Sequence, residues 1–136
     1  MVKVNLAIIG GRDFNDYNYA RSCINYIVSK YDFEITNIIS GGASGADKLG
    51  EIYADEYKIN KKIFIAKWDD ISRSDSIIRT NSFGKKYDAN AGFRRNTDII
   101  VNSDVVIAFW DYNSKETKDS IEKSKKMNKF LIIFKY

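Results

Sequence analysis

Short apolar runs alternate with longer amphipathic stretches along the whole chain, and most of the apolar runs end at glycine or at a polar residue. The run 4–9 is apolar except for Asn5 and ends at Gly10, a pattern typical of strands that are buried on both faces. The stretch 15–30 repeats its apolar residues at helical spacing. Strands that alternate with helices favour a mainly parallel sheet with helices on both faces, because each crossover returns the chain to the same edge.

We therefore predict an α/β fold with a five-stranded sheet in a single domain, residues 1–136. The predicted strands are 4–9, 36–39, 62–66, 104–109 and 130–134, and the predicted helices are 15–30, 46–57, 92–102 and 114–127. Residues 69–91 are polar and break the rhythm, so we interpret them as an irregular loop, which is often functional at this length. In such sheets ligands bind beyond the carboxyl ends of the strands.

The chain contains no histidine and one cysteine, Cys23, which we expect to be buried in the first helix. Imidazole bases, Ser-His-Asp relays, His-bound zinc and internal disulfides are therefore excluded. Any chemistry must come from carboxylates, cationic side chains, hydroxyl groups, backbone amides or a hard metal. We predict neither a metal site nor a cofactor.

The segment 40–47, Ser-Gly-Gly-Ala-Ser-Gly-Ala-Asp, is the clearest candidate binding loop. Its glycines allow close approach of a ligand to backbone amides, and the helix that follows directs its positive dipole end there. This is what a phosphate requires, although a tight strand-to-helix turn would use the same glycines. Asp47 is either an acceptor for ribose hydroxyls, a partner for an arginine, or a carboxylate favoured by the helix dipole.

The other strand ends also carry polar groups. Arg12 could clamp a phosphate through two parallel hydrogen bonds, or be a surface residue. Arg94 and Arg95 point about 100° apart on a helix, so only one of them is expected to face the rim. Trp68 and Trp110 could stack on a base or cover the edge of the core. We expect a positively biased cup fitted to an oxyanion, with these ligand-binding residues: Gly10, Gly11, Arg12, Asp13, Ser40, Gly41, Gly42, Ala43, Ser44, Gly45, Asp47, Trp68, Arg94, Arg95, Asn96, Trp110, Asp111, Ser114, Lys115 and Thr117.

Four of these motifs together resemble the SLOG superfamily of DprA-like and lonely-guy-like proteins. The motifs are Gly-Gly-Arg-Asp-Phe at 10–14, the segment 40–47, Gly-Phe-Arg-Arg-Asn at 92–96, and Phe-Trp-Asp at 109–111 with Ser114 and Thr117. The match looks most like the small stand-alone YspA-like branch of bacteria and phages, and it runs from residue 3 to residue 135. The resemblance implies a Rossmann-like domain that binds nucleotides or nucleotide-derived small molecules.

The resemblance also bears on catalysis, because the lonely-guy branch cleaves the N-glycosidic bond of nucleoside monophosphates. Its enzymes use an arginine at the start of the penultimate helix, where Arg95 stands, and a glutamate at the position of Ser120. Glycoside hydrolysis needs a carboxylate, so the serine argues against this activity. We identify no catalytic residue with certainty; if the chain is an enzyme, the candidates are Arg95, Glu116 and Asp111.

We expect the chain to bind a phosphorylated nucleotide-derived molecule, such as an ADP-ribose-like or cyclic nucleotide signal. It would act as a sensor or as a sequestering sponge, a role suited to a viral antagonist of host immune signalling. One alternative is a nucleotide N-glycosidase or phosphoribohydrolase. A second is single-stranded nucleic-acid binding, which belongs to the DprA branch.

The net charge and the absence of targeting signals bear on the partners and the location that we expect. Lys and Arg number 22 against 18 Asp and Glu, a net charge of +4 that is interleaved with acids, so we do not expect nucleic acid as a partner. No apolar run approaches the length of a membrane span, and the N-terminus lacks the pattern of a signal peptide. We expect a homo-oligomer, a dimer or larger, without a membrane partner, in the cytoplasm of a bacterium or of a phage-infected cell.

Overall fold

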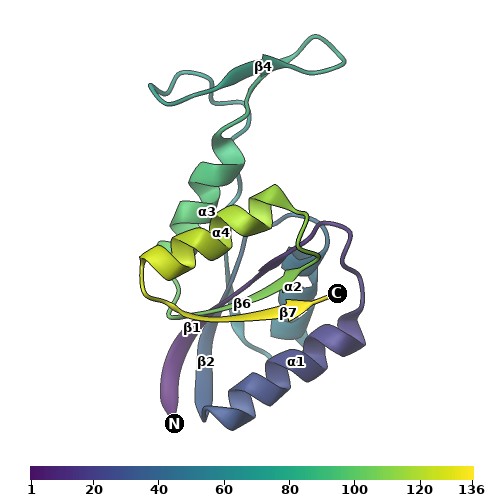
Figure 1. The fold of residues 1–136 in the computed structure, drawn as a ribbon, viewed down its shortest axis with the longest axis vertical. Coiled ribbons are helices and arrows are strands. Elements are labelled where there is room, and N and C mark those ends of the chain that lie inside the picture. The colour runs from purple at the N-terminus through teal and green to yellow at the C-terminus, as the bar shows by residue number, and fades with distance from the viewer.

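A computed structural model describes residues 1–136. Its main sheet has five parallel strands in the order β3-β2-β1-β6-β7 (Figure 1), which confirms the predicted α/β class. These strands are β1 (Val2–Gly10), β2 (Phe33–Ser40), β3 (Asn60–Ile63), β6 (Val105–Trp110) and β7 (Phe130–Lys135). The helices are α1 (Tyr17–Lys30), α2 (Ala46–Glu56), α3 (Ala91–Val101) and α4 (Lys115–Lys126).

The alternation of side chains along β1 builds both cores. Leu6 and Ile8 pack with residues of α1 and α2, whereas Ala7 and Ile9 pack with residues of α3 and α4. A buried isoleucine contributes about 1.5–3 kcal/mol, and a slip of one residue would exchange the two faces of the strand. The apolar run of β1 therefore fixes the register of the central strand.

The strand order reverses beside β1, and this places the candidate site. From β1 the chain moves outward to β2 and β3, then crosses to β6 and β7 on the other side. The carboxyl ends of β1 and β6 lie together, since Gly10 pairs with Phe109. Ligands of such sheets bind at this reversal point.

The third strand differs from its prediction. It runs from Asn60 to Ile63, whereas the sequence indicated 62–66. All four of its side chains are exposed, so no apolar pattern marks the edge strand.

The segment 69–91, for which we expected no regular structure, contains a two-stranded antiparallel hairpin of β4 (Ile78–Thr80) and β5 (Lys86–Asp88). Each strand has three residues, too few for an alternating pattern to show in the sequence. We refer to residues 69–90 as the arm. It extends beyond the N-terminal end of α3, away from the main sheet (Figure 1).

A buried carboxylate holds the base of the arm. Asp88 has no exposed surface and accepts hydrogen bonds from the backbone amides of Ile77 at 3.0 Å and Asn90 at 2.9 Å. Arg94 of α3 donates to Asp88 at 2.9 Å and to Asp75 at 2.7 Å. Burial alone would raise the pKa of Asp88, but these hydrogen bonds and the guanidinium outweigh it and lower the pKa to about 2.

No helix in the structure combines the length and the apolar character needed to cross a bilayer.

We predict that Arg94→Gln loosens the arm. Loss of a charge-assisted hydrogen bond should speed amide hydrogen exchange in residues 76–88 by about tenfold or more, with unchanged exchange in β1 and β6. Arg73→Gln is the matched control, because Arg73 is exposed and lies 3.8 Å from Asp75 alone. Equal protection of the arm in Arg94→Gln and in the control would contradict this role.

The arm should also respond to acid. The folded pKa of Asp88, about 2, lies below its ordinary value of 3.8, so the stabilisation is complete above pH about 4 and is lost as the pH falls towards 2. Hydrogen exchange, corrected for its intrinsic pH dependence, should therefore show arm opening in that range before the sheet unfolds.

Candidate functional site

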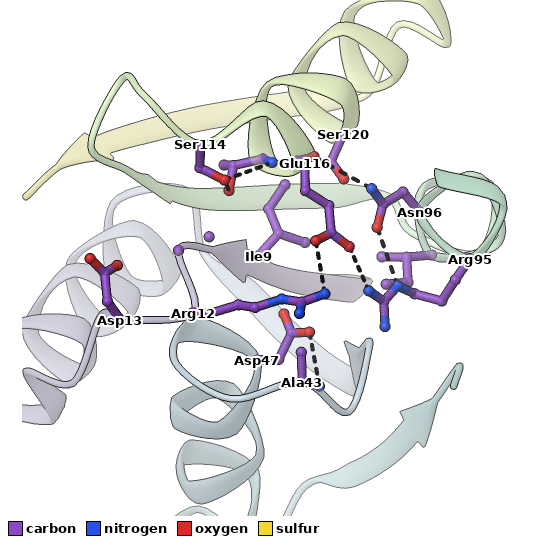
Figure 2. Close-up of a pocket in the computed structure, with 14 residues that line it drawn as sticks. Ile9, Arg12, Asp13, Ala43, Asp47, Arg95, Asn96, Ser114, Glu116 and Ser120 are labelled. Atoms are coloured by element: carbon purple, nitrogen blue, oxygen red, sulfur yellow. Dashed lines mark hydrogen bonds and ion pairs between the residues drawn. The ribbon is translucent and has the colours of Figure 1, made fainter. Parts of the chain in front are cut away.

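A cavity of about 260 Å³ lies at the carboxyl ends of β1 and β6, and we call it the rim cavity (Figure 2). It draws side chains from the turns after β1 and β2, from α3 and from the start of α4. Its lining residues are Ile9, Gly10, Gly11, Arg12, Asp13, Ala43, Asp47, Arg95, Asn96, Ile99, Ser114, Glu116, Thr117 and Ser120. Its volume approaches the lower end of the range for small-molecule sites.

One carboxylate lies between two guanidinium groups in this cavity. Arg12 donates to Glu116 Oε2 at 3.0 Å, and Arg95 donates to Glu116 Oε1 at 2.7 Å (Figure 2). Arg12 follows β1, Arg95 is on α3, and Glu116 is in the first turn of α4. The cavity thus contains two cationic groups already arranged around a single oxyanion.

Arg95 is held rigidly, because its side chain is only 6% exposed and has three partners. Besides Glu116 it donates to the carbonyl oxygen of Gly41 and, at 3.2 Å, to Asn96 Oδ1. The neighbouring Arg94 points instead to the base of the arm. Of the two adjacent arginines, Arg95 alone lines the rim cavity.

Asp47 lies beside Arg95 in the first turn of α2 and is buried. It accepts a hydrogen bond from the amide of Ala43 at 3.2 Å. Burial raises the pKa of Asp47 to about 6, against the opposing effects of Arg95 and of the Ala43 amide. Asp47 is therefore a carboxyl group that gains a proton just below neutral pH.

The turns after β1 and β2 pack directly on each other, and two glycines permit it. Gly45 has φ 76°, and a Cβ there would lie 2.1 Å from the carbonyl oxygen of Gly11. Gly10 has φ 153°, and a Cβ there would lie 2.3 Å from the carbonyl oxygen of Phe109. These two glycines therefore serve the packing of the turns, and that packing brings Arg12 next to the segment 40–47.

The start of α4 supplies the opposite wall. Ser114 caps the helix by accepting from the Thr117 amide at 3.2 Å, whereas the amides of Lys115 and Glu116 have no acceptor within the helix. Asp111 lies outside the rim cavity and accepts from the amides of Asn113 at 2.8 Å and Ser114 at 2.9 Å. These hydrogen bonds lower the pKa of Asp111. Asp111 therefore stabilises the turn between β6 and α4.

Several predicted ligand-binding residues lie beside a second cavity of about 180 Å³, which we call the side cavity. It is lined by Arg12, Gly41, Gly42, Ala43, Ser44, Ile65, Ala66, Trp68 and Arg95. Three of these residues, Arg12, Ala43 and Arg95, also line the rim cavity. The two cavities are therefore neighbours that share both arginines.

The remaining predicted residues have structural contacts. Ser40 is buried and donates to Glu51 at 2.8 Å, and Trp110 donates to the carbonyl oxygen of Ser114 at 3.1 Å and stacks on Tyr112. Neither residue lines either cavity, nor does Lys115.

Our ligand-binding set omitted Ile9, Ile99 and Ser120 and gave Glu116 only a conditional catalytic role. Ile9 and Ile99 carry no polar signal. Ser120 and Glu116 are four residues apart on α4 and therefore share a face, which is the sequence signal that links them. No group of three or more Cys, Asp or Glu side chains is placed to hold a metal ion.

The predicted positive bias of the cup is not present. Arg12 and Arg95 face Glu116 and Asp47, and Asp13 accepts from the Tyr136 hydroxyl at 2.6 Å on the same rim. The sequence located the two cations but could not show that a carboxylate of α4 would reach between them.

No model of a known protein family matches the chain, and no curated protein matches it. Among solved structures, the chain is similar to DNA processing protein A (DprA) from Helicobacter pylori, whose structure was reported for its single-stranded DNA binding mode. The TM-score is 0.62 at 22% sequence identity, over 97% of this chain and 64% of that chain. The similarity confirms the Rossmann-like fold. The chain spans less than two thirds of that protein, and the YspA-like branch stays a prediction.

The comparison corrects the expectation about nucleic acid. We did not expect nucleic acid as a partner because the net charge is modest, but a protein with this fold binds single-stranded DNA. The expectation was wrong because it rested on the net charge of the chain, whereas binding depends on where the cations lie.

We predict that Asp47→Asn changes the pH dependence of stability. The folded pKa of Asp47, about 6, exceeds its ordinary 3.8, so between these values the folded chain keeps a proton that the unfolded chain has released. Stability therefore falls as the pH rises through this window. In urea unfolding, the free energy of unfolding of Asp47→Asn relative to that of the wild type should increase by at most about 3 kcal/mol between pH about 4 and 7.

Asp111→Asn provides the contrast. The pKa of Asp111 is lowered, so this variant should lose stability relative to the wild type as the pH rises from acid to neutral. The same trend in both variants would contradict the burial argument for Asp47.

Proposed function

We propose that this chain binds single-stranded nucleic acid and holds a backbone phosphate in the rim cavity. The observation that carries the proposal is the convergence of Arg12 and Arg95 on one oxyanion position, the place of Glu116 Oε1 and Oε2. Glu116 and Thr117 of the first turn of α4 line the same cavity, and helix N-termini favour anions. The similarity to a single-stranded DNA-binding protein supports a nucleic-acid source for the phosphate.

In this proposal Glu116 acts as an internal counter-ion that a phosphate displaces. The Glu116 side chain is 31% exposed and borders solvent, whereas the Arg95 side chain is buried. A backbone phosphodiester has two charged non-bridging oxygens, as a carboxylate has, and can therefore take the place of Glu116 between the two guanidinium groups. The arginines therefore stay paired whether or not a ligand is present.

The side cavity suits the base attached to that phosphate. Trp68 lines it and keeps 37% of its surface exposed, and an aromatic face binds any base by stacking. Because the side cavity shares Arg12 and Arg95 with the rim cavity, one nucleotide can reach both. Recognition of this kind depends on stacking and charge and is tolerant of sequence.

The expected sensor or sponge for a signalling nucleotide gains no support from the comparisons. A mononucleotide presents the same phosphate as a strand, so it belongs in the test as a competitor.

We predict that Arg12→Gln weakens binding of a fluorescent thymidine oligomer by about tenfold or more, because a charge-assisted hydrogen bond contributes about 1.5–3 kcal/mol. The slope of log affinity against log salt should fall in magnitude by about 0.7, the value for one lost phosphate contact on a single strand. Fluorescence anisotropy at several salt concentrations measures both.

Arg21→Gln is the matched control, since Arg21 is an exposed arginine on α1 that pairs with Glu56 at 3.1 Å, as Arg12 pairs with Glu116 at 3.0 Å. The control should bind as the wild type does. Equal affinity of Arg12→Gln and Arg21→Gln for the oligomer would contradict the proposal. So would a mononucleotide that displaces the labelled oligomer at a concentration at which an unlabelled strand does not displace it.

Hydrolysis of an N-glycoside is the second candidate function, and one observation favours it. Glu116 and Asp47 share the rim cavity, with Glu116 paired to two arginines and the pKa of Asp47 raised to about 6. Two carboxyl groups in such different surroundings suit an ionised group that stabilises a cationic sugar and a group that donates a proton. Glu116 lies one helical turn before Ser120, on the same face of α4.

Glu116→Gln separates the two functions. If Glu116 is a displaceable counter-ion, its neutral replacement should tighten oligomer binding severalfold, because a competing anion is removed. If it is catalytic, the wild type should release free base from a nucleoside monophosphate and Glu116→Gln should not, as chromatography of the products would show. Weaker oligomer binding by Glu116→Gln without any wild-type turnover would contradict both accounts.

A further inference from the structure

The hairpin of the arm carries positive charge, although the arm as a whole has four acids against four cations. Residues 76–87 contain Arg79, Lys85 and Lys86 but no Asp or Glu, in a chain whose net charge is +4. All three side chains are exposed, and only Lys85 has an acidic partner, Asp69 at 2.9 Å. The hairpin therefore presents two cations without an ion pair, Arg79 and Lys86, at the protein surface.

The tip of the arm presents an aromatic ring. Phe83 is 93% exposed, and the turn that carries it is ordered by Asn81, whose side chain accepts from the amides of Phe83 at 2.9 Å and Lys85 at 3.0 Å. The exposure of Phe83 is therefore a property of an ordered turn. Solvent-exposed aromatic rings between cations are typical of surfaces that bind single strands.

The arm is continuous with the proposed nucleotide site. Trp68 lines the side cavity, and its carbonyl oxygen accepts from the amide of Asp88 at the base of the arm at 2.7 Å. Between the two lies a third cavity of about 140 Å³, whose charged lining residues are Lys67, Arg73, Arg94, Arg95 and Asp98. Arg73, Arg94 and Arg95 have acidic partners, so Lys67 is the cation of this cavity that is free of an ion pair.

We propose that the arm binds the same nucleic-acid strand that the rim cavity holds, with Arg79 and Lys86 on its phosphates and Phe83 stacked on a base. This inference rests on the proposed function and extends it by several nucleotides. Single-strand binding sites of about 4–16 nucleotides commonly combine a basic track with aromatic platforms.

A second copy of this chain is the other occupant to consider, and the charge of the arm disfavours it. Two hairpins that pair through their β4 edges would bring Arg79 against Arg79, and pairing through their β5 edges would bring Lys86 against Lys86. Lysine and arginine on short edge strands oppose such pairing. Phosphates, in contrast, complement these charges.

The test compares thymidine oligomers of about four and about 20 nucleotides, because only the longer one can reach from the rim to the arm. We expect the double variant Arg79→Gln/Lys86→Gln to bind the longer oligomer about tenfold more weakly, with a salt slope smaller by about 1.4. We expect Phe83→Ala to bind it about fivefold more weakly with an unchanged slope, since stacking carries no net charge. Affinity for the shorter oligomer should equal that of the wild type in both.

The control is Lys125→Gln/Lys126→Gln, which removes the same charge from exposed residues at the far end of α4. If both double variants bind the longer oligomer equally while Arg12→Gln still weakens binding, the role of the arm is overturned and the proposed function stands. If the wild type binds neither oligomer, the proposed function itself fails. Sedimentation is the last check. If it shows that the wild-type protein self-associates and that the arm variant is a monomer, that result assigns the arm to contact with a second copy of the chain and overturns the inference.

Discussion

The buried guanidinium of Arg95 joins three parts of the structure that are distant in sequence. It binds the Gly41 carbonyl of the turn after β2, Asn96 on its own helix, and Glu116 at the start of α4. A buried charge that loses its partner costs about 3 kcal/mol or more, so these contacts hold the rim cavity in shape. The place of Arg12, the environment of Asp47 and the position of Glu116 all depend on this one group.

The parallel sheet could be predicted because its central strand carries the apolar run 6–9, which ends at Gly10. The turns at 10–13 and 40–47 could be located because each follows an apolar run. The hairpin of the arm could not be predicted, since strands of three residues are too short to show a periodic signal. The contact of Glu116 with both arginines could not be predicted either, because it depends on how α3 and α4 pack across the sheet. The error about nucleic acid came from relying on the net charge of the whole chain, which does not show where individual cations lie.

The candidate site contains acids where an anion site would be expected to contain only bases. Asp47 is buried at a cost, as its raised pKa records, and Glu116 neutralises the arginines while no ligand is bound. Carboxyl groups with a strongly raised pKa, such as Asp47, cluster at functional sites. In the proposed function Asp47 and Glu116 keep Arg95 and Arg12 aligned until a phosphate replaces Glu116.

The most direct test of this account is a crystal structure of the chain with a short thymidine oligomer bound. The account predicts phosphate oxygens within about 3 Å of the guanidinium nitrogens of Arg12 and Arg95, with the Glu116 side chain turned out of the rim cavity. A strand bound elsewhere, with Glu116 still between the two arginines, would contradict it.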